Sequence, residues 1–163
     1  MHTMAKMNIG PRRSEGGQAI VELALTLPLL LLVVMGIFDF GFMFQRYEVV
    51  TNAAREGARV GVLQASGYTT GDAAQRALQY MDVGGLNVPT RGCGGALAPG
   101  TRCASAAVSS VTITGSVPAK TVNQITVAVE YDHQYSFVGP IMNLFGGSLG
   151  TVRLRAVSTM RIE

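Results

Sequence analysis

The sequence predicts an α+β protein: a long N-terminal helix, transmembrane at first and amphipathic later, packed by a small antiparallel β-sheet domain. Three observations lead to this class. An apolar block near the N-terminus is long enough to cross a bilayer, an amphipathic helical pattern follows it directly, and the second half of the chain contains three stretches rich in β-branched residues. A chain of 163 residues has room for an anchor and one modest domain, so a multidomain catalyst is not expected.

Residues 1–17 are polar and basic and lack the apolar periodicity on which a fold could be built. Three basic residues against one acidic residue put +2 of the formal net charge of +3 into this segment. Because the cytoplasmic flanks of membrane helices are enriched in basic residues, we expect residues 1–17 to be a cytoplasmic leader, with the later domain outside. The remaining basic residues are scattered, so nucleic-acid binding is not expected.

The apolar block covers residues 19–44 and would extend ~39 Å at about 1.5 Å per helical residue, more than the roughly 30 Å of a bilayer core. A secretory signal peptide carries small residues at a cleavage site beyond its apolar region. Four aromatic residues stand there instead, namely Phe38, Phe40, Phe42 and Phe44. We therefore expect any trimming to occur on the near side and the block to remain as a single-pass membrane anchor, with a cytoplasmic N-terminus.

Residues 45–64 continue the helix, with no helix breaker before Gly57. Apolar side chains recur three to four residues apart and form one stripe that a domain could cover; they are Val49, Val50, Ala53, Ala54, Ala58 and Val62. We predict one continuous helix over residues 18–64, with its lower half in lipid and its upper half in protein.

Residues 65–163 are predicted to form an extracytoplasmic α+β domain. A second helix is expected over residues 72–83, followed by a glycine- and proline-rich loop over residues 86–106. A long connection at residues 133–150 would contain one helical turn near residues 141–145. β-Branched residues with partial alternation predict three strands, at residues 108–114, 124–131 and 152–160.

Cys93 and Cys103 lie in the predicted loop with nine residues between them. We expect a disulfide if the loop is exported, and two free thiols are the alternative. A metal site is not expected, because two cysteines lack the other two ligands and neither His2 nor His133 is nearby in the sequence. No cofactor is expected either, because no phosphate-binding glycine loop is present.

Glu22 stands five positions after Gly17, at the edge of the membrane helix. A charged side chain costs about 2.5–3.5 kcal/mol at the centre of a membrane helix, so this carboxylate calls for a partner. Cleavage after Gly17 would create an α-amine on Gln18, one helical turn from Glu22, and an assembled neighbour could offer its own amine. The alternative is a carboxylate that snorkels to the headgroups of an ordinary anchor.

The block from Gly17 to Leu25, followed by Pro28, resembles the processing site and helix start of type IV pilin-like proteins. The specific resemblance is to TadE-like proteins, in which a glycine, four residues, a glutamate and an apolar helix with a proline precede an Arg-Glu-Gly-Ala-Arg segment. Here that segment is Arg55, Glu56, Gly57, Ala58 and Arg59. The last ten residues are similar to the ends of many such proteins. Leu23 departs from the pattern, because related pilins often have an aromatic residue there.

The resemblance implies a type IV pilin-like fold and a minor pilin, or pseudopilin, of a tight-adherence (Flp-type) pilus that acts structurally in assembly, adhesion, biofilm formation or secretion. A prepilin peptidase would cut between Gly17 and Gln18, and Glu22, Leu23 and Pro28 would serve recognition or assembly. The implied partners are other Tad/Flp pilins and minor pilins, the peptidase, the inner-membrane assembly platform and the lipid bilayer. The mature protein would enter the extracellular pilus or stay at its base.

Simpler interpretations stand beside these. Pro28 could be a kink without functional meaning. Residues 55–59 could be a solvated helix face, in which Glu56 and Arg59 pair and Gly57 permits close approach of another backbone. Asp39, near the outer end of the apolar block, is expected at the membrane interface or paired with Arg46, with a contact to another subunit as the alternative.

No enzymatic activity is expected. Glu130, Asp132 and His133 are close together at a strand end, but the alternation of a strand puts the two acids on one side and the histidine on the other. Two further alternatives are an uncleaved signal-anchored surface module that binds a ligand or envelope partner, and a periplasm-facing enzyme.

Overall fold

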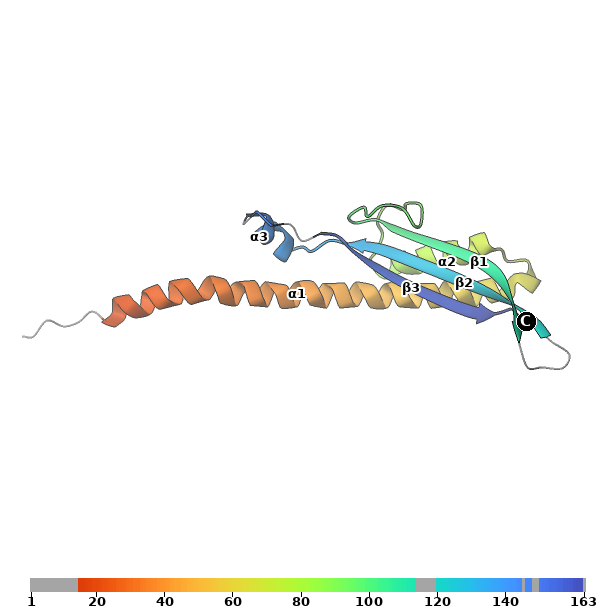
Figure 1. Cartoon of the computed structure of the whole chain (residues 1–163), viewed down its shortest axis with the longest axis horizontal. Coiled ribbons are helices and arrows are strands. Elements are labelled where there is room, and N and C mark those ends of the chain that lie inside the picture. Colours follow the sequence, from red (N-terminus) through yellow and green to blue (C-terminus); the bar gives the residue numbers. More distant parts are fainter. Residues whose placement is uncertain (1–14, 114–119, 145, 148–149, 163) are drawn as a thin grey trace, which may run out of the picture.

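A computed structural model of the chain describes residues 15–113, 120–144, 146–147 and 150–162. Most of the predicted leader, residues 1–14, lies outside this description. A long helix carries a three-stranded antiparallel sheet along its second half, while its first half extends beyond the sheet, with α3 beside part of it (Figure 1), which confirms the α+β class. The elements are α1 (Glu15–Gly61), a 3-10 helix η1 (Val62–Ser66), α2 (Thr70–Val83), β1 (Arg102–Ile113), β2 (Lys120–His133), α3 (Val138–Leu144) and β3 (Val152–Arg161).

Helix α1 has 47 residues and continues through Pro28. Proline has no N–H to donate, so the helix loses one backbone hydrogen bond there. Two residues earlier, the Thr26 hydroxyl donates to the carbonyl oxygen of Glu22 over 2.9 Å. The helix begins at Glu15, a little before the predicted start, so that Gly17 and Gln18 lie in its first turn.

The sheet has the strand order β1-β2-β3, with β2 in the centre. Alternate residues of β2 turn inward, and Ile125, Val127 and Val129 are completely buried. Strand β1 begins at Arg102 rather than at residue 108 as predicted, because Arg102 is in register with Tyr131 and the pairing continues from there. The pairing therefore extends this strand through Ser105, Ala106 and Ala107, residues with no strong preference for strands.

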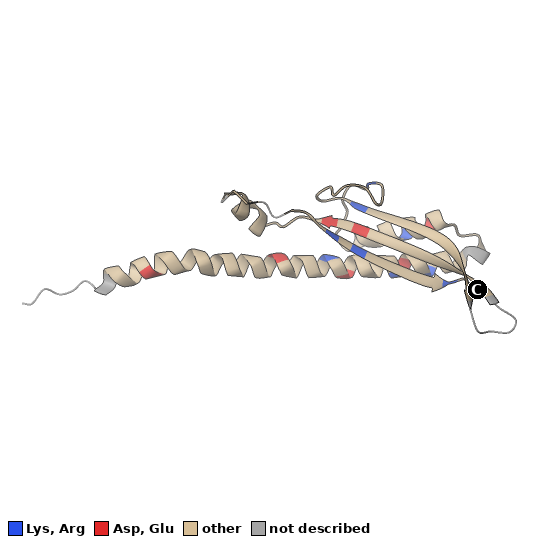
Figure 2. Cartoon of the chain, viewed as in Figure 1, with Lys and Arg blue, Asp and Glu red and all other residues tan. Residues whose placement is uncertain are grey.

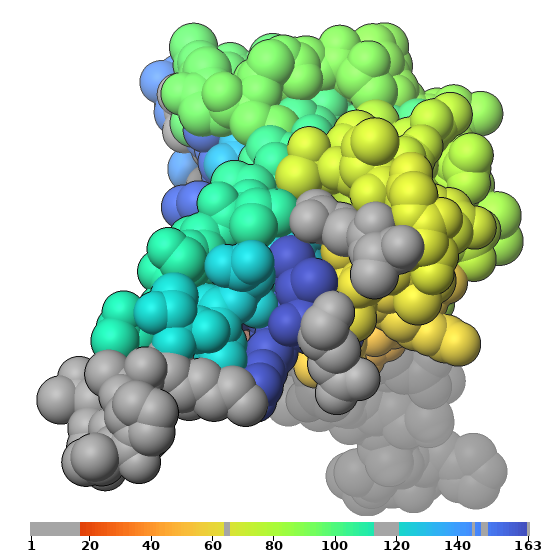
Figure 3. All heavy atoms as spheres, turned by 90° about the vertical axis from the view of Figure 1, so that its right-hand side faces the viewer, coloured from red at the N-terminus to blue at the C-terminus, as the bar shows by residue number. Residues whose placement is uncertain are grey.

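The core is shared between the long helix and the domain. The apolar stripe predicted on α1 is buried at Val50, Ala53, Ala54 and Ala58, and it faces the inner side of the sheet. Helix α2 adds a second buried surface, formed by the small Ala73 and Ala77 and the large Met81. In the end-on view, α2 and the strands pack side by side (Figure 3). Small side chains on both helices let them approach closely.

Helix α2 starts with a capping box. The Thr69 hydroxyl accepts from the backbone N–H of Asp72, and the Asp72 carboxylate accepts from the backbone N–H of Thr69 over 2.7 Å. The side-chain hydrogen bond from Thr69, followed by the backbone hydrogen bond, lowers the pKa of Asp72. These bonds satisfy amide groups that a helix start leaves free, which explains why the helix begins at this point.

Candidate functional site

The candidate site is the bare half of α1. Every side chain from residue 17 to residue 34 is exposed, and α1 is long and apolar enough to cross a membrane. Figure 2 shows a long stretch of this half without any charged residue, between two acidic bands. The bands are Glu22 and Asp39. An unpartnered apolar helix of this length needs lipid or other helices around it.

The predicted processing residues lie together at the start of this half. Gly17, Gln18 and Glu22 are all exposed, and the helix places Gln18 and Glu22 one turn apart on the same face. Among the side chains that the structure describes, Glu22 has no hydrogen-bond or ion-pair partner. Leu23 is 60% exposed and belongs to a hollow on the helix surface with Thr26 and Leu30.

The Arg-Glu-Gly-Ala-Arg segment lies on the buried half, where α2 crosses α1. A Cβ atom added to Gly57 would stand 2.7 Å from the carbonyl oxygen of Ala73, so only glycine lets the α2 backbone come this close. Glu56 accepts from Arg76 of α2 over 2.9 Å, and its other oxygen is 3.8 Å from Arg59. Ala58 is buried, whereas Arg55 is exposed and contacts Asn52. In this structure the segment therefore joins α1 to α2.

Asp39 does not pair with Arg46 and does not face water. Its side chain is 1% exposed, and its two oxygens accept hydrogen bonds from the backbone N–H groups of Ser136, Phe137 and Val138 over 2.7–3.2 Å. The predicted Asp39–Arg46 pair was therefore wrong. The reason is that the connection after β2 folds back onto α1 and places its amides around this carboxylate.

Arg46 instead contacts the end of β2. Its Nη1 lies 2.7 Å from Nδ1 of His133, and its guanidinium carbon lies 5.7 Å from the centre of the Tyr131 ring. His133 is fully buried on the inner face of the sheet. Burial lowers the pKa of His133, the positive charge of Arg46 lowers it further, and Asp39 raises it.

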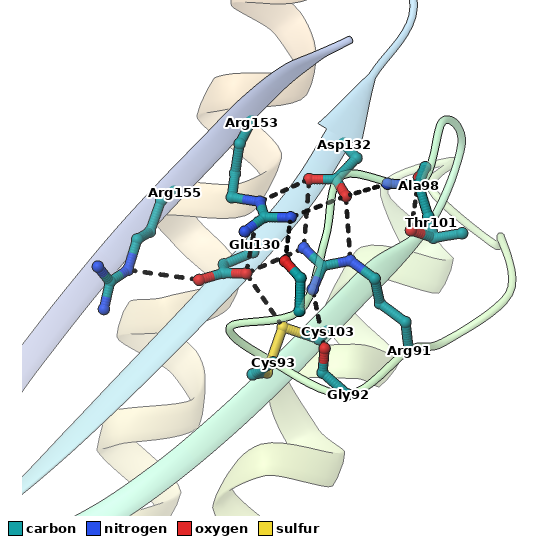
Figure 4. A network of polar contacts seen from close by, with 11 residues as sticks. Arg91, Gly92, Cys93, Ala98, Thr101, Cys103, Glu130, Asp132, Arg153 and Arg155 are labelled. Atoms are coloured by element: carbon teal, nitrogen blue, oxygen red, sulfur yellow. Dashed lines mark hydrogen bonds and ion pairs between the residues drawn. A yellow bond between two sulfur atoms is a disulfide. The ribbon is translucent and has the colours of Figure 1, made fainter.

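The outer face of the sheet carries a polar cluster at the same end (Figure 4). Asp132 accepts from Arg153 over 2.8 Å, from Arg91 over 3.0 Å and from the backbone N–H of Ala98 over 2.9 Å. Glu130 accepts from Arg91 over 2.9 Å. Burial raises the pKa of Asp132, but the hydrogen bonds from Arg153, Ala98 and Arg91 outweigh it and lower the pKa to about 2.

The loop that covers this cluster is held by a disulfide between Cys93 and Cys103. The Cys103 sulfur also lies 3.6 Å from the Glu130 carboxylate. Both carboxylates of the cluster are taken up by arginines, and His133 faces the opposite side of the strand, as alternation predicts. Sequence reasoning missed Arg91 and Arg153, because their partners are 41 and 21 residues away in the chain.

Comparison with known proteins bears on the long helix. The family model described as TadE-like protein matches residues 17–59. The matched segment contains the bare half of α1 and ends at Arg59, the last residue of the Arg-Glu-Gly-Ala-Arg segment. No curated protein and no solved structure matches the chain. Over residues 17–59 the chain is thus similar to TadE-like proteins of the Tad pilus system, as the residues quoted above predicted.

Proposed function

We propose that the protein is a minor pilin of a tight-adherence pilus. Its α1 helix anchors the precursor in the inner membrane, is trimmed between Gly17 and Gln18, and then packs against the helices of other pilins. The division of α1 carries this proposal: the first half is bare and apolar, and the second half is built into the domain core. An element of this kind can exchange lipid for neighbouring helices without unfolding the domain.

Glu22 is the polar contact for assembly. Trimming after Gly17 leaves a cation on Gln18, and Gln18 and Glu22 lie one turn apart on the same face of α1. In an assembly the same carboxylate would receive the amine of an adjacent pilin. Close helix packing in lipid is favoured by small and polar residues, and Thr26 and Gly36 lie exposed or half-buried on the same half of α1.

The role is structural rather than catalytic. The acids that cluster in the domain, Glu130 and Asp132, are engaged by arginines and stabilise the loop over the sheet. His133 accepts a hydrogen bond from Arg46 and is buried. Adhesion, biofilm formation or secretion would follow from assembly with other pilus components.

The test is the mass of the full chain after membrane extraction, with and without a co-expressed prepilin peptidase. We expect loss of residues 1–17 only when the peptidase is present. Gly17→Ala should prevent the cut, and Glu22→Gln should reduce cleavage or assembly with other pilins. Glu48→Gln removes an exposed carboxylate from the same helix and should change neither. An intact leader in all samples would contradict processing and favour an uncleaved surface module.

A further inference from the structure

The inference starts from the segment that follows β2. Residues 134–144 contain no Asp, Glu, Lys or Arg. Figure 1 shows α3 beyond the ends of the strands, beside the first half of α1. Two of its apolar side chains are open to the surroundings: Phe137 is 42% exposed and Leu144 is 83% exposed. Exposed apolar side chains gathered in one uncharged segment indicate a surface that contacts lipid or another protein.

The segment is nevertheless held against α1 at defined points. The Phe137 ring lies 6.4 Å from the Phe42 ring, centre to centre, in a stacked arrangement. Ile141 lines a common hollow with Leu32 and Met35 of α1. Between these contacts, the Asp39 carboxylate binds three consecutive amides at the start of α3. The segment thus lies beside residues 32–42 of α1.

The position of the membrane along α1 follows from its charges. Residues 22 and 39 are separated by ~25 Å along the axis at about 1.5 Å per residue. If Glu22 marks the inner boundary, a hydrocarbon core of roughly 30 Å ends near residue 42, a little less than one helical turn beyond Asp39. Residues 32–42 then lie in the outer leaflet, and so does the segment packed beside them.

We propose that residues 134–144 form a second membrane-embedded element, which inserts into the outer leaflet beside α1 and is surrounded there by acyl chains. The occupant is lipid because the uncovered side of α3 is continuous with the bare surface of α1 and carries no charge. The inference rests on the anchoring role of α1 in the proposed function, and it gives the pilin domain a second contact with the bilayer.

Asp39 holds this element against α1 through hydrogen bonds to its backbone. Asp39 lies within one turn of the outer boundary set above, and a carboxylate inside the hydrocarbon core is costly without hydrogen-bond partners. Three backbone N–H groups are those partners. Because Asp39 is only 1% exposed, lipid does not reach its carboxylate. The same bonds satisfy amides at the start of α3, which would otherwise be unpaired in an apolar medium. The hydrogen bonds therefore lower the free-energy cost of placing both the Asp39 carboxylate and these amides inside the membrane.

The chain contains no tryptophan, so single-tryptophan variants of the full chain can report contact with lipid. Three are reconstituted in phosphatidylcholine vesicles with brominated acyl chains, which quench fluorescence on contact. Leu144→Trp reports on α3, Ile37→Trp on the bare face of α1, and Val111→Trp on the exposed far part of β1. We expect Leu144→Trp to lose as much emission as Ile37→Trp and Val111→Trp to lose none.

The results separate the two proposals. If Ile37→Trp is quenched and Leu144→Trp is not, the inference is overturned while the anchor stands. Blue-shifted but unquenched Leu144→Trp emission would mean that a second copy covers α3, which also overturns it. If neither is quenched, the membrane anchor of the proposed function fails as well.

The role of Asp39 is tested by adding Asp39→Asn to the Leu144→Trp and Ile37→Trp variants. We expect weaker quenching of Leu144→Trp and unchanged quenching of Ile37→Trp, because α3 is released while α1 stays inserted. Unchanged quenching of Leu144→Trp would overturn the role given to Asp39. Ile37→Trp in the same background shows that the variant chain is still folded into the bilayer.

Discussion

Arg46 donates a hydrogen bond to Nδ1 of His133 over 2.7 Å. An arginine has no acceptor, so Nδ1 must offer its lone pair, and the neutral ring then carries its proton on Nε2. A proton on Nδ1 would break this bond and place two cations side by side. The pair therefore links α1 to the end of β2 only while His133 is neutral.

The first prediction is a loss of stability on acidification. Because burial and Arg46 lower the pKa of His133 below 6.5, the unfolded chain takes up a proton at a higher pH than the folded chain does. The stabilisation is complete above pH 6.5 and is lost as the pH falls through the lowered pKa. Melting temperatures measured in detergent should therefore drop between about pH 7 and pH 5.

The matched variant is His133→Asn, whose side-chain oxygen can take the place of Nδ1 without titrating. We expect the melting temperature of this variant to stay nearly constant between about pH 7 and pH 5. An equally steep drop in His133→Asn would assign the acid sensitivity to another group.

Asp132→Asn should destabilise the domain strongly. The change leaves Arg91 and Arg153, both mostly buried, without a carboxylate that each now contacts within 3.0 Å. Breaking a buried ion pair from one side typically costs about 3–5 kcal/mol. Chemical denaturation of the detergent-solubilised protein measures this loss. Arg155→Ala is the control: Arg155 has a 60% exposed side chain 3.6 Å from Glu130, and its removal should cost less than about 1 kcal/mol.

The pH dependence of the same cluster has its own range. The pKa of Asp132 falls from 3.8 to about 2 on folding, so its contribution is present above pH 3.8 and is lost as the pH falls towards 2. At about 1.4 kcal/mol per pKa unit this amounts to the order of 2 kcal/mol. In Asp132→Asn this part of the acid transition should vanish, and its persistence would point to other carboxylates.

Gly57→Ala should weaken the junction of α1 and α2. The added Cβ would stand 2.7 Å from the Ala73 carbonyl oxygen and 3.0 Å from the Ala77 Cβ, so the helices must separate, at a cost of about 1–3 kcal/mol. Gly41→Ala is the same change on the same helix, with nothing within 4 Å of the new Cβ. It should be neutral or slightly stabilising, because alanine favours helices. Equal losses in both variants would refute the packing role of Gly57.

Reduction of the Cys93–Cys103 disulfide should loosen the loop over the polar cluster. Closing a loop of this size contributes about 2–3 kcal/mol in the chain-entropy model. Thermal melting with and without a reductant measures the difference, and the double variant Cys93→Ser with Cys103→Ser should melt like the reduced protein. A reductant effect that persists in the double variant would have a different origin.

Much of this fold could be predicted from sequence because its signals are local. The apolar block and the stripe that follows it run along one helix, so their periodicity predicted most of α1. The helix begins at Glu15 rather than at residue 18, and it gives way to the 3-10 helix η1 at Val62 rather than continuing to residue 64. The start of β1 could not be predicted in this way. Residues 103–107 are Cys-Ala-Ser-Ala-Ala, and they form a strand because β2 provides the pairing partner.

For the candidate site too, the local features could be predicted from sequence and the contacts between distant residues could not. Gly17, Glu22 and the Arg-Glu-Gly-Ala-Arg segment are recognisable because their spacing within one helix is fixed. The contacts of Asp39 are not, because its donors are backbone amides 97 to 99 residues away and every residue except proline has such an amide. A charged residue in an apolar block indicated that some partner was needed, but not which one.

The shared core also has a mechanical consequence. Val50, Ala53 and Ala54 belong both to α1 and to the core of the domain. Helix α1 is a single rod from Glu15 to Gly61. A pull on the outer domain therefore passes directly into the rod, without a flexible joint to absorb it. For the same reason, a shortened version that starts beyond residue 61 would lack part of its own interior, and any soluble fragment should begin before Val50.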